Sequence, residues 1–598
     1  MRKESYFTSA PTPPNFEYYP YSDAATYDRP AQNMIIGVGQ NNKIILHPLY
    51  VFFLAFLHMI GGQNYDNVIF FQILFLAVMP ALAYLLASMV GGRAAGVLTA
   101  ILIILREKNA IALTNVIEIS HSKLLMTDVP VAVLMLLMVY VLIKWLRKPS
   151  NTNYLGFFAG ASYGLAMLVR SHQILLIIPA LFIGMAFSGG FQLKRTIQRI
   201  AVFVLGLAIV VGPWIWRNYV VNGKPEIESS KSFIAWYAGA YTEPTDSAEI
   251  RPGESPDDYS ARIRRQVFQY ILNHPSELAR IYASYFIRNE IDSVIYLPMS
   301  LKLYNVRSYI SGMQFWSDPL INFTIGSGLA FFIVLGLIVL GISIAVQRLG
   351  FLGLLPLLIH FNYNFGTAVA RISGWRFVQP VDWIMQLYYC IGLMALTVVV
   401  ISLVSNKLSA IINKKKEDEE SVNNLSVGIK TRQLLFVLFL GISLPLTEVL
   451  IPERYSEIGA DQMIAQYTAG GFLLDNGDKV TESDMKSFLE TETGAVVLYG
   501  RAIYPRYYEA GEYWGSVDSY PLSVRNMNRL QFNLIGAKRG GLVFIPMQEA
   551  PEYFPHASDV LIVGCTTKDG IQALAVKVND RSSFVTTSPW RGLTCSVQ

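Results

Sequence analysis

Two aspartates in this chain have positions from which a carboxylate could act on a bound hydroxyl group. Asp23 lies in the polar segment Tyr21–Asp28, and Asp128 begins an apolar run that continues to Leu146. A carboxylate within hydrogen-bond reach of a hydroxyl can remove its proton during a transfer reaction. Each aspartate could instead have a purely structural role. Asp23 could be a solvated turn former, and Asp128 could cap a helix ahead of Pro130.

Arginines stand at or beside the ends of several apolar runs, namely Arg170, Arg217, Arg371 and Arg376. The planar guanidinium group can bind a phosphate through two parallel hydrogen bonds. Carboxylates and arginines that face one cavity would suit a reaction in which a hydroxyl loses its proton and a phosphate departs. Any one of these arginines could instead extend along lipid to reach the headgroups.

One histidine and one acidic cluster complete the candidates. His47 precedes Pro48 at the start of an apolar stretch, where it could support the acidic segment or simply satisfy one hydrogen bond at an interface. Glu118, His121 and Asp128 could bind a divalent metal ion, although their spacing is not diagnostic of one. The sequence therefore assigns no cofactor and leaves a divalent metal possible.

The composition indicates which elements must hold these residues. The chain has 598 residues, of which 53% are hydrophobic and only 15% charged, whereas soluble chains carry about 25% charged residues. This composition excludes a disordered protein, a disulfide scaffold and a simple soluble enzyme. The formal net charge of +5 gives no argument for a nucleic-acid partner.

Apolar runs of sufficient length predict a mainly α, polytopic transmembrane bundle. A bilayer core of about 30 Å takes about 20 apolar residues per helix. On that basis we expect about ten spans, the last four of them short: Asp66–Met89, Val129–Leu146, Ile200–Trp216, Leu320–Val346, Gln379–Val404, Gln433–Ile451, Ala94–Leu105, Tyr154–Val169, His172–Phe187 and Phe351–Ala368. The stretch His47–Ile60 is too short to cross and predicts an interfacial or re-entrant helix.

Lysines and arginines concentrate in alternate short connections, which predicts that these connections are cytoplasmic. On this scheme the N-terminus, the long loop near 219–319 and everything after Pro452 lie outside, while Arg106 and Lys108 fit poorly. The polar N-terminus has no signal peptide. We therefore expect either a short translocated tail or a further span upstream of Met1.

The pattern of runs divides the chain into four regions. Residues 1–218 form an N-terminal membrane region with a first outer segment, and 219–319 form an extracytoplasmic loop domain. Residues 320–451 hold further spans and a cytoplasmic linker at 406–431, and 452–598 form an extracytoplasmic, soluble α+β module.

Local signals give some detail of the outer regions. Prolines predict helix starts at Pro256–Asn273 and Pro275–Ile291. Val560–Cys565 and Gln572–Val578 flank a turn signal and predict a β-hairpin. Cys565 could pair with the last cysteine, Cys595, in an oxidising exterior, or both could remain free thiols.

Several stretches, taken in order, resemble the polytopic GT-C glycosyltransferases that use lipid-linked sugars, such as the protein mannosyltransferases and the aminoarabinose transferases of lipid A. The stretches are Tyr21–Tyr27 with the later His47-Pro48, Met126–Asp128, Gly160–Arg170, Gly212–Tyr219 and, more weakly, Gly374–Phe377. They are similar to the family's first outer loop with its essential acid, the Thr-Glu pair that opens a later span (here with Asp in place of Glu), its Gly-rich span, its Pro-Trp-x-x-Arg-Asn signature and its later Arg element. Two departures are the missing span before the first loop and the lack of an acidic neighbour at Asp23.

The resemblance implies an integral membrane hexosyl- or pentosyltransferase of the cell membrane. Such an enzyme moves a sugar from a polyprenyl-phosphate donor to a hydroxyl of a glycan, lipid or protein acceptor on the extracytoplasmic face. The resemblance implies catalytic roles for Asp23, as general base, and for Asp128. It implies substrate-binding roles for four further residues: His47, Arg170, Arg217 and Arg376.

Two alternatives to an enzyme stay open from the residues alone. A transporter or flippase of a lipid-linked saccharide would tend to show internal repeats and charged or broken helices near the midplane. The chain has no convincing repeat, and its ionisable residues gather at one predicted face, which favours an enzyme. The other alternative is a non-catalytic scaffold whose outer module binds a partner.

Overall fold

The computed structural model describes the chain apart from residues 1–4, 39–43, 115–117, 148–152, 172–173, 175–176, 189, 229–240, 242–250, 296–324, 405–430, 513–523, 525, 538–539, 580–581 and 596–598. The chain divides into two compact units. The membrane unit consists of Lys43–Tyr50 and Gln72–Pro445. The terminal unit draws on both ends of the sequence, with Met1–Asn42, Val51–Phe71 and Leu446–Gln598.

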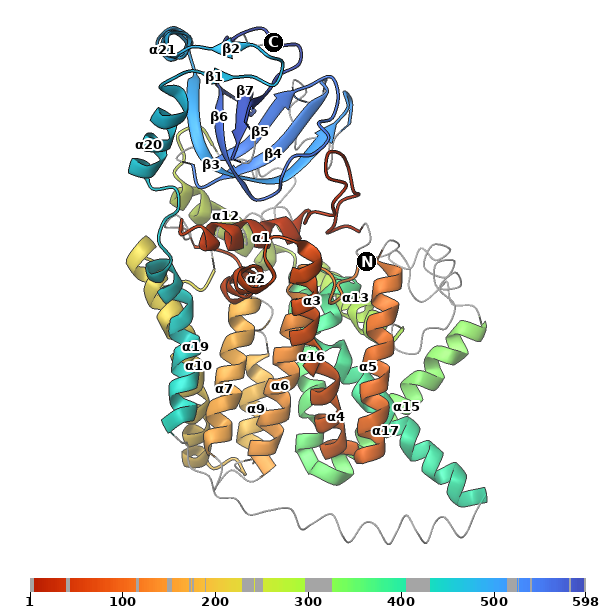
Figure 1. The fold of residues 1–598 in the computed structure, drawn as a ribbon. Coiled ribbons are helices and arrows are strands. Elements are labelled where there is room, and N and C mark those ends of the chain that lie inside the picture. Colours follow the sequence, from red (N-terminus) through yellow and green to blue (C-terminus); the bar gives the residue numbers. More distant parts are fainter. Residues whose placement is uncertain are drawn as a thin grey trace. The chain divides into compact units, whose positions relative to one another are not determined.

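Helices make up most of the membrane unit, and most of them are apolar (Figure 1). They are α4 (Val78–Gly91), α5 (Arg93–Leu113), α6 (Asp128–Arg147), α7 (Asn153–Val169), α9 (Ile178–Ser188), α10 (Leu193–Asn222), α12 (Pro256–Asn273), α13 (Pro275–Ile295), α15 (Ile325–Leu349), the 3₁₀ turn η2 (Gly350–Leu354), α16 (Leu355–Val369) and α17 (Trp375–Val404). Helices α2 (Pro48–Gly61), α3 (Tyr65–Leu76) and α19 (Thr431–Leu450) cross a unit boundary.

The predicted transmembrane bundle is confirmed, and all the expected spans overlap helices. Within the described residues, five helical segments are long and apolar enough to cross a bilayer: Tyr65–Gly91, Asp128–Arg147, Leu193–Asn222, Phe331–Val369 and Trp375–Ser402. Shorter apolar helices include α7 and α9, and residues 172–173 and 175–176 of one expected span lie outside the described part. Large side chains such as Phe70, Leu205 and Phe332 are exposed on these helices, as contact with lipid requires.

Glycine allows two of these helices to approach closely. A Cβ atom built on Gly160 of α7 would lie 1.8 Å from the carbonyl oxygen of Phe203 in α10, and one built on Gly206 would lie 2.0 Å from that of Phe157. Any side chain at either position would overlap the facing backbone, so small residues are needed here. The contact holds α7, which leads into Arg170, against α10.

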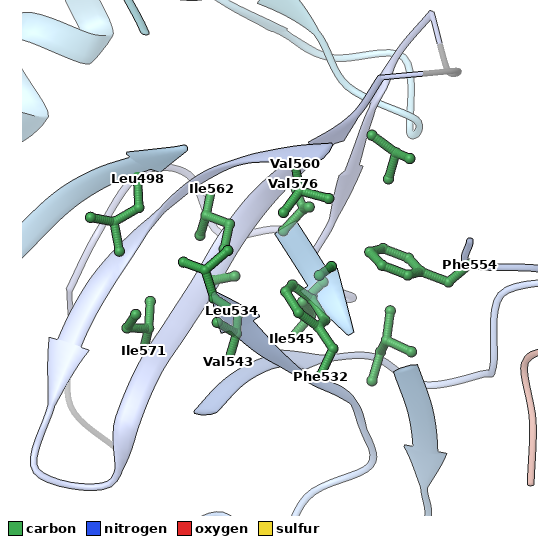
Figure 2. Close-up of a cluster of buried hydrophobic side chains, with 14 residues drawn as sticks. Leu498, Phe532, Leu534, Val543, Ile545, Phe554, Val560, Ile562, Ile571 and Val576 are labelled. Atoms are coloured by element: carbon green, nitrogen blue, oxygen red, sulfur yellow. The ribbon is translucent and has the colours of Figure 1, made fainter. Parts of the chain in front are cut away.

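A β-sheet forms the C-terminal part of the terminal unit. Its strands are β3 (Ala495–Tyr508), β4 (Arg529–Ile535), β5 (Gly541–Pro546), β6 (Ser558–Thr567), β7 (Gly570–Val578) and β8 (Phe584–Thr586), in the order β5-β4-β3-β6-β7-β8. Because β5 also pairs with β7, five strands close on themselves. Figure 2 shows the apolar interior, with Phe532, Val543 and Ile562 among its buried side chains.

Smaller elements surround this sheet. They are the short strands β1 (Phe472–Leu473) and β2 (Lys479–Val480) and the helices α20 (Glu457–Thr468) and α21 (Glu482–Thr491). The predicted hairpin is confirmed, since β6 and β7 pair antiparallel down to Thr567 and Gly570. Cys565 and Cys595 form a disulfide, so the oxidised alternative holds.

The first outer segment differs from the sequence-based expectation. Where the sequence suggests a turn at Asp23, the helix α1 (Asp23–Ile35) begins. Its buried residues follow a helical spacing, at Ala24, Tyr27, Asp28, Ala31 and Met34. An amphipathic helix buried on one side therefore replaces the solvated loop, within the same unit as the C-terminal sheet.

Candidate functional site

The carboxylate of Asp128 forms ion pairs with two arginines. Asp128 is the first residue of α6 and its side chain is fully buried. Nη1 of Arg170 donates to its Oδ1 atom, and Nε of Arg376 donates to its Oδ2 atom at 3.2 Å. The structure thus brings together three of the residues that the sequence proposes, and the carboxylate holds both guanidinium groups in place.

The surrounding elements fix the positions of these two arginines. Arg170 directly follows α7, whereas Arg376 lies in the first turn of α17, after Gly374 with φ of +135°. The ring of Phe377 lies beneath both guanidinium carbons, 5.8 Å from that of Arg170 and 5.4 Å from that of Arg376. The two positive groups therefore share one anionic anchor and one aromatic surface.

Glu118 also belongs to this cluster, through a contact with Arg376 that the sequence did not suggest. Its Oε1 atom accepts a hydrogen bond of 3.2 Å from Nη1 of Arg376. Within the described residues, no group of three His, Cys, Asp or Glu side chains is arranged to hold a metal ion. Glu118 is accordingly assigned to the arginine cluster.

A second cluster centres on Glu228, which the sequence did not single out. Its Oε1 atom lies 2.9 Å from Nδ1 of His47 and accepts the backbone N–H of that residue at 3.0 Å. Its Oε2 atom accepts a hydrogen bond of 2.8 Å from the hydroxyl of Ser171. Because Ser171 follows Arg170, the two clusters are joined through consecutive residues.

The Pro-Trp-x-x-Arg-Asn segment fixes the position of the backbone that leads to Glu228. The indole of Trp214 donates to the carbonyl oxygen of Ile227 at 2.9 Å, and the amide of Asn218 donates to that of Glu226 at 2.7 Å. These bonds hold the backbone just before Glu228 against α10. An acid that follows this segment, ten residues after Asn218, is a signal that sequence reading could use.

Arg217 lies within α10 rather than at its end. Its guanidinium stacks on the ring of Trp214 at 5.1 Å and donates from Nη1 to Oδ1 of Asn218 at 3.0 Å. Arg371, in the turn before α17, stacks on Tyr241 at 4.4 Å. Both arginines are therefore partly occupied by neighbouring aromatic rings.

Asp23 belongs to the terminal unit, where it lies half-buried in the first turn of α1. One helical turn further on, Asp28 is completely buried. Its Oδ1 atom lies 2.8 Å from Nε2 of His58, and its Oδ2 atom accepts hydroxyl hydrogen bonds of 2.6 Å from both Tyr65 and Tyr504. Asp28 therefore ties α1 to the strand β3, rather than pairing with Asp23 at a metal site.

The partners of Asp28 keep it ionised. Burial raises the pKa of its carboxyl group, but the charge of His58 and the hydrogen bonds from that ring and the two tyrosines outweigh burial. The pKa of Asp28 consequently lies below its ordinary value of 3.8. The result is a buried, charged anchor between the two ends of the chain.

Arg106, which fits the charge pattern poorly, has a structural explanation. Its Nε atom donates to Oδ2 of Asp382 at 2.9 Å, and both side chains are buried. Each charge is therefore compensated inside the bundle. The position of Arg106 thus gives no information on which side of the membrane its connection lies.

Comparisons with known proteins give one family match and several structural similarities. Residues 47–216 match the family model described as dolichyl-phosphate-mannose-protein mannosyltransferase, whereas no curated protein matches the chain. The chain is similar to the oligosaccharyltransferase of Archaeoglobus fulgidus in its apo form, at 14% identity and a TM-score of 0.37, with 78% of this chain and 53% of that chain covered. It is also similar to ArnT from Cupriavidus metallidurans bound to undecaprenyl phosphate, at 12% identity and a TM-score of 0.29, with 73% and 84% covered.

The chain spans about half the length of the archaeal oligosaccharyltransferase. The family match begins at His47 and ends just before Arg217, so it includes Asp128, Arg170 and the helices that carry them. The match over residues 47–216 confirms the resemblance to membrane glycosyltransferases that the motifs indicate.

Proposed function

We propose that the protein is an integral membrane glycosyltransferase that moves a sugar from a polyprenyl-phosphate donor to an acceptor hydroxyl on the extracytoplasmic face of the cell membrane. The observation that carries this proposal is the pair of guanidinium groups, of Arg170 and Arg376, anchored on the buried Asp128. The similarity of residues 47–216 to dolichyl-phosphate-mannose-dependent enzymes supports it.

The arginine pair suits a phosphate leaving group. When the bond between the anomeric carbon and the phosphate oxygen breaks, the departing phosphate gains negative charge. Arg170 and Arg376, held in fixed directions by Asp128, stabilise that charge without reorganising. In this proposal Asp128 acts through the arginines, and Arg217 neutralises the same phosphate from α10.

Asp23 is the proposed general base. It accepts the proton of the acceptor hydroxyl while that oxygen bonds to the anomeric carbon, and the bonding pair of the old C–O bond leaves with the lipid phosphate. His47, held by Glu228, supports the acidic segment. The acceptor is a glycan, lipid or protein hydroxyl, and the sugar is a hexose or pentose.

The test uses membranes that contain the full chain and a radiolabelled lipid-linked sugar. Asp23→Asn should lower turnover by about 10²–10⁴-fold while the protein still inserts. Glu17→Gln, a change to another acid ahead of α1, serves as the control and should leave turnover unchanged. Near-wild-type turnover in Asp23→Asn would remove this residue from the mechanism, and carrier translocation without sugar transfer would favour a flippase.

A further inference from the structure

A hollow of about 150 Å³ lies beside the seam at which β5 and β7 close the sheet, and we call it the polar hollow. Gln572 of β7 lines it, between Ile571 and Ala573, whose side chains belong to the apolar interior that Figure 2 shows. Because successive side chains of a strand point to opposite faces, Gln572 points out of the sheet. Leu574 of β7 and Pro546, the last residue of β5, also line the polar hollow.

The segment that follows β8 supplies another wall of the polar hollow. The backbone N–H of Thr587 donates to the carbonyl oxygen of Leu574 at 3.0 Å. The backbone N–H of Ser588 donates to the carbonyl oxygen of Pro546 at 2.9 Å. The start of this segment is therefore fixed on both strands of the seam.

A disulfide fixes the other end of the same segment. Cys595 is bonded to Cys565 of β6, and Cys565 pairs with Gln572 across the β6–β7 ladder. The backbone N–H of Cys595 also donates to Oε2 of Glu492 at 2.8 Å. The wall is thus held at both ends without a ligand, so binding need not order it first.

Polar side chains around the polar hollow make no hydrogen bond or ion pair with the described part of the protein. They are Gln572, Thr587, Ser588, Arg591 and Thr594. Together they offer three hydroxyl groups, one amide and one guanidinium group. Hydroxyl and amide groups both donate and accept hydrogen bonds, whereas a guanidinium group only donates them. The polar hollow therefore presents donors and acceptors together with a single positive charge.

These properties indicate the class of ligand. Sites for drug-sized molecules measure about 300–1,000 Å³, so 150 Å³ suits a single ring. An apolar ring would leave the polar side chains without partners, which is unfavourable. A sugar ring carries hydroxyl groups that donate and accept, and its C–H face can pack on Leu574 and Pro546.

We propose that the polar hollow binds one saccharide ring of a cell-surface glycan, through Gln572, Arg591 and the hydroxyl groups of the segment after β8. The site lies wholly within the terminal unit. Disulfides such as the one between Cys565 and Cys595 persist in oxidising compartments outside the cytoplasm, where such glycans are exposed. The C-terminal module thereby gains a binding role that does not depend on the proposed transferase activity.

Saturation-transfer NMR with the full chain in lipid nanodiscs tests the proposal, because nanodiscs avoid sugar-based detergents. The probes are glucose, galactose, mannose and N-acetylglucosamine, without any lipid-linked donor. We expect saturable binding of at least one of them. The double variant Gln572→Ala, Arg591→Ala should weaken that binding at least about tenfold, because it removes several hydrogen bonds, some of them from a charged donor.

The matched control is the double variant Gln548→Ala, Lys568→Ala. It removes one amide and one cation from exposed side chains of the same module that do not line the polar hollow. This control should bind the sugar like the wild type. Both double variants should unfold at the same temperature as the wild type, which separates a loss of binding from misfolding.

Absence of saturable binding for all four sugars, or equal binding by the Gln572→Ala, Arg591→Ala variant and the wild type, would overturn the proposal. Binding of glucuronate and acetate without any neutral sugar, abolished by Arg591→Ala alone, would make the polar hollow an anion site and overturn the saccharide assignment. Because no donor is present, this measurement and the sugar-transfer assay fail independently of each other.

Discussion

Asp128 holds two guanidinium groups on its two oxygens while lying completely out of solvent. Asp128→Asn keeps the shape of this side chain but removes the countercharge of Arg170 and Arg376. We expect the free energy of unfolding to fall by about 3–5 kcal/mol, as for other buried pairs that lose one partner. Unfolding in detergent measures this, with the exposed Asp66→Asn as the control. An unchanged unfolding transition would show that the cluster does not stabilise the bundle.

Glu228 offers a second test at the scale of single residues. Glu228→Gln keeps a hydrogen-bond acceptor near Ser171 but weakens the hold on His47. If His47 supports the acidic segment, misplacing it should lower turnover by about 10²-fold while stability changes little. Glu226→Gln is the control, because Asn218 donates to the backbone oxygen of Glu226, which this substitution keeps. Loss of stability without loss of turnover would make Glu228 purely structural.

At the scale of elements, the contact between α7 and α10 depends on Gly206. A Cβ atom there would lie 2.0 Å from the carbonyl oxygen of Phe157, whereas one on Gly212 of the same helix meets nothing within 4 Å. Gly206→Ala should therefore destabilise the protein by about 1–3 kcal/mol through overpacking. Gly212→Ala should be neutral or slightly stabilising, since alanine favours helix. Equal thermal unfolding of the two variants would contradict this account.

Most elements could be predicted because their causes are local. Apolar runs specify the spans, prolines specify the starts of α12 and α13, and the turn before Gly570 specifies the hairpin. The helix α1 could not be predicted, because its buried side includes Asp28 and Gln32. A hydrophobic pattern assigns such polar residues to the solvent-exposed side of a helix. Its partners in the terminal unit, not its own polarity, decide its structure.

The candidate site was predictable only in part for a similar reason. Asp128, Arg170 and Arg376 each stand out locally, but the partners of Asp128 lie 42 and 248 residues away. Glu228 lies 181 residues from His47. No periodic pattern carries information over such separations, so the sequence yields candidates and the fold yields their pairing.

At the scale of the whole molecule, Asp28 makes the terminal unit sensitive to acid. Its pKa is below 3.8 in the folded protein, so its carboxylate contributes stability above the unfolded value that is lost as the pH falls through the folded value. The free energies of unfolding of the wild type and Asp28→Asn should therefore differ by about 1–3 kcal/mol at neutral pH. They should converge as the pH falls through the lowered pKa of Asp28 in the folded protein. A difference that persists in strong acid would assign the effect to shape rather than charge.

The hydroxyl of Tyr504 reaches Asp28 across 476 residues of sequence. A ribosome that has made only α1 has thus produced an acid whose second tyrosine partner is still to be translated, together with the strand that covers it. The helix α1 therefore stays without part of its packing until the 476 residues that separate Asp28 from Tyr504 have been made. A nonsense mutation shortly after α19 would consequently leave the buried Asp28 of α1 without its partner Tyr504.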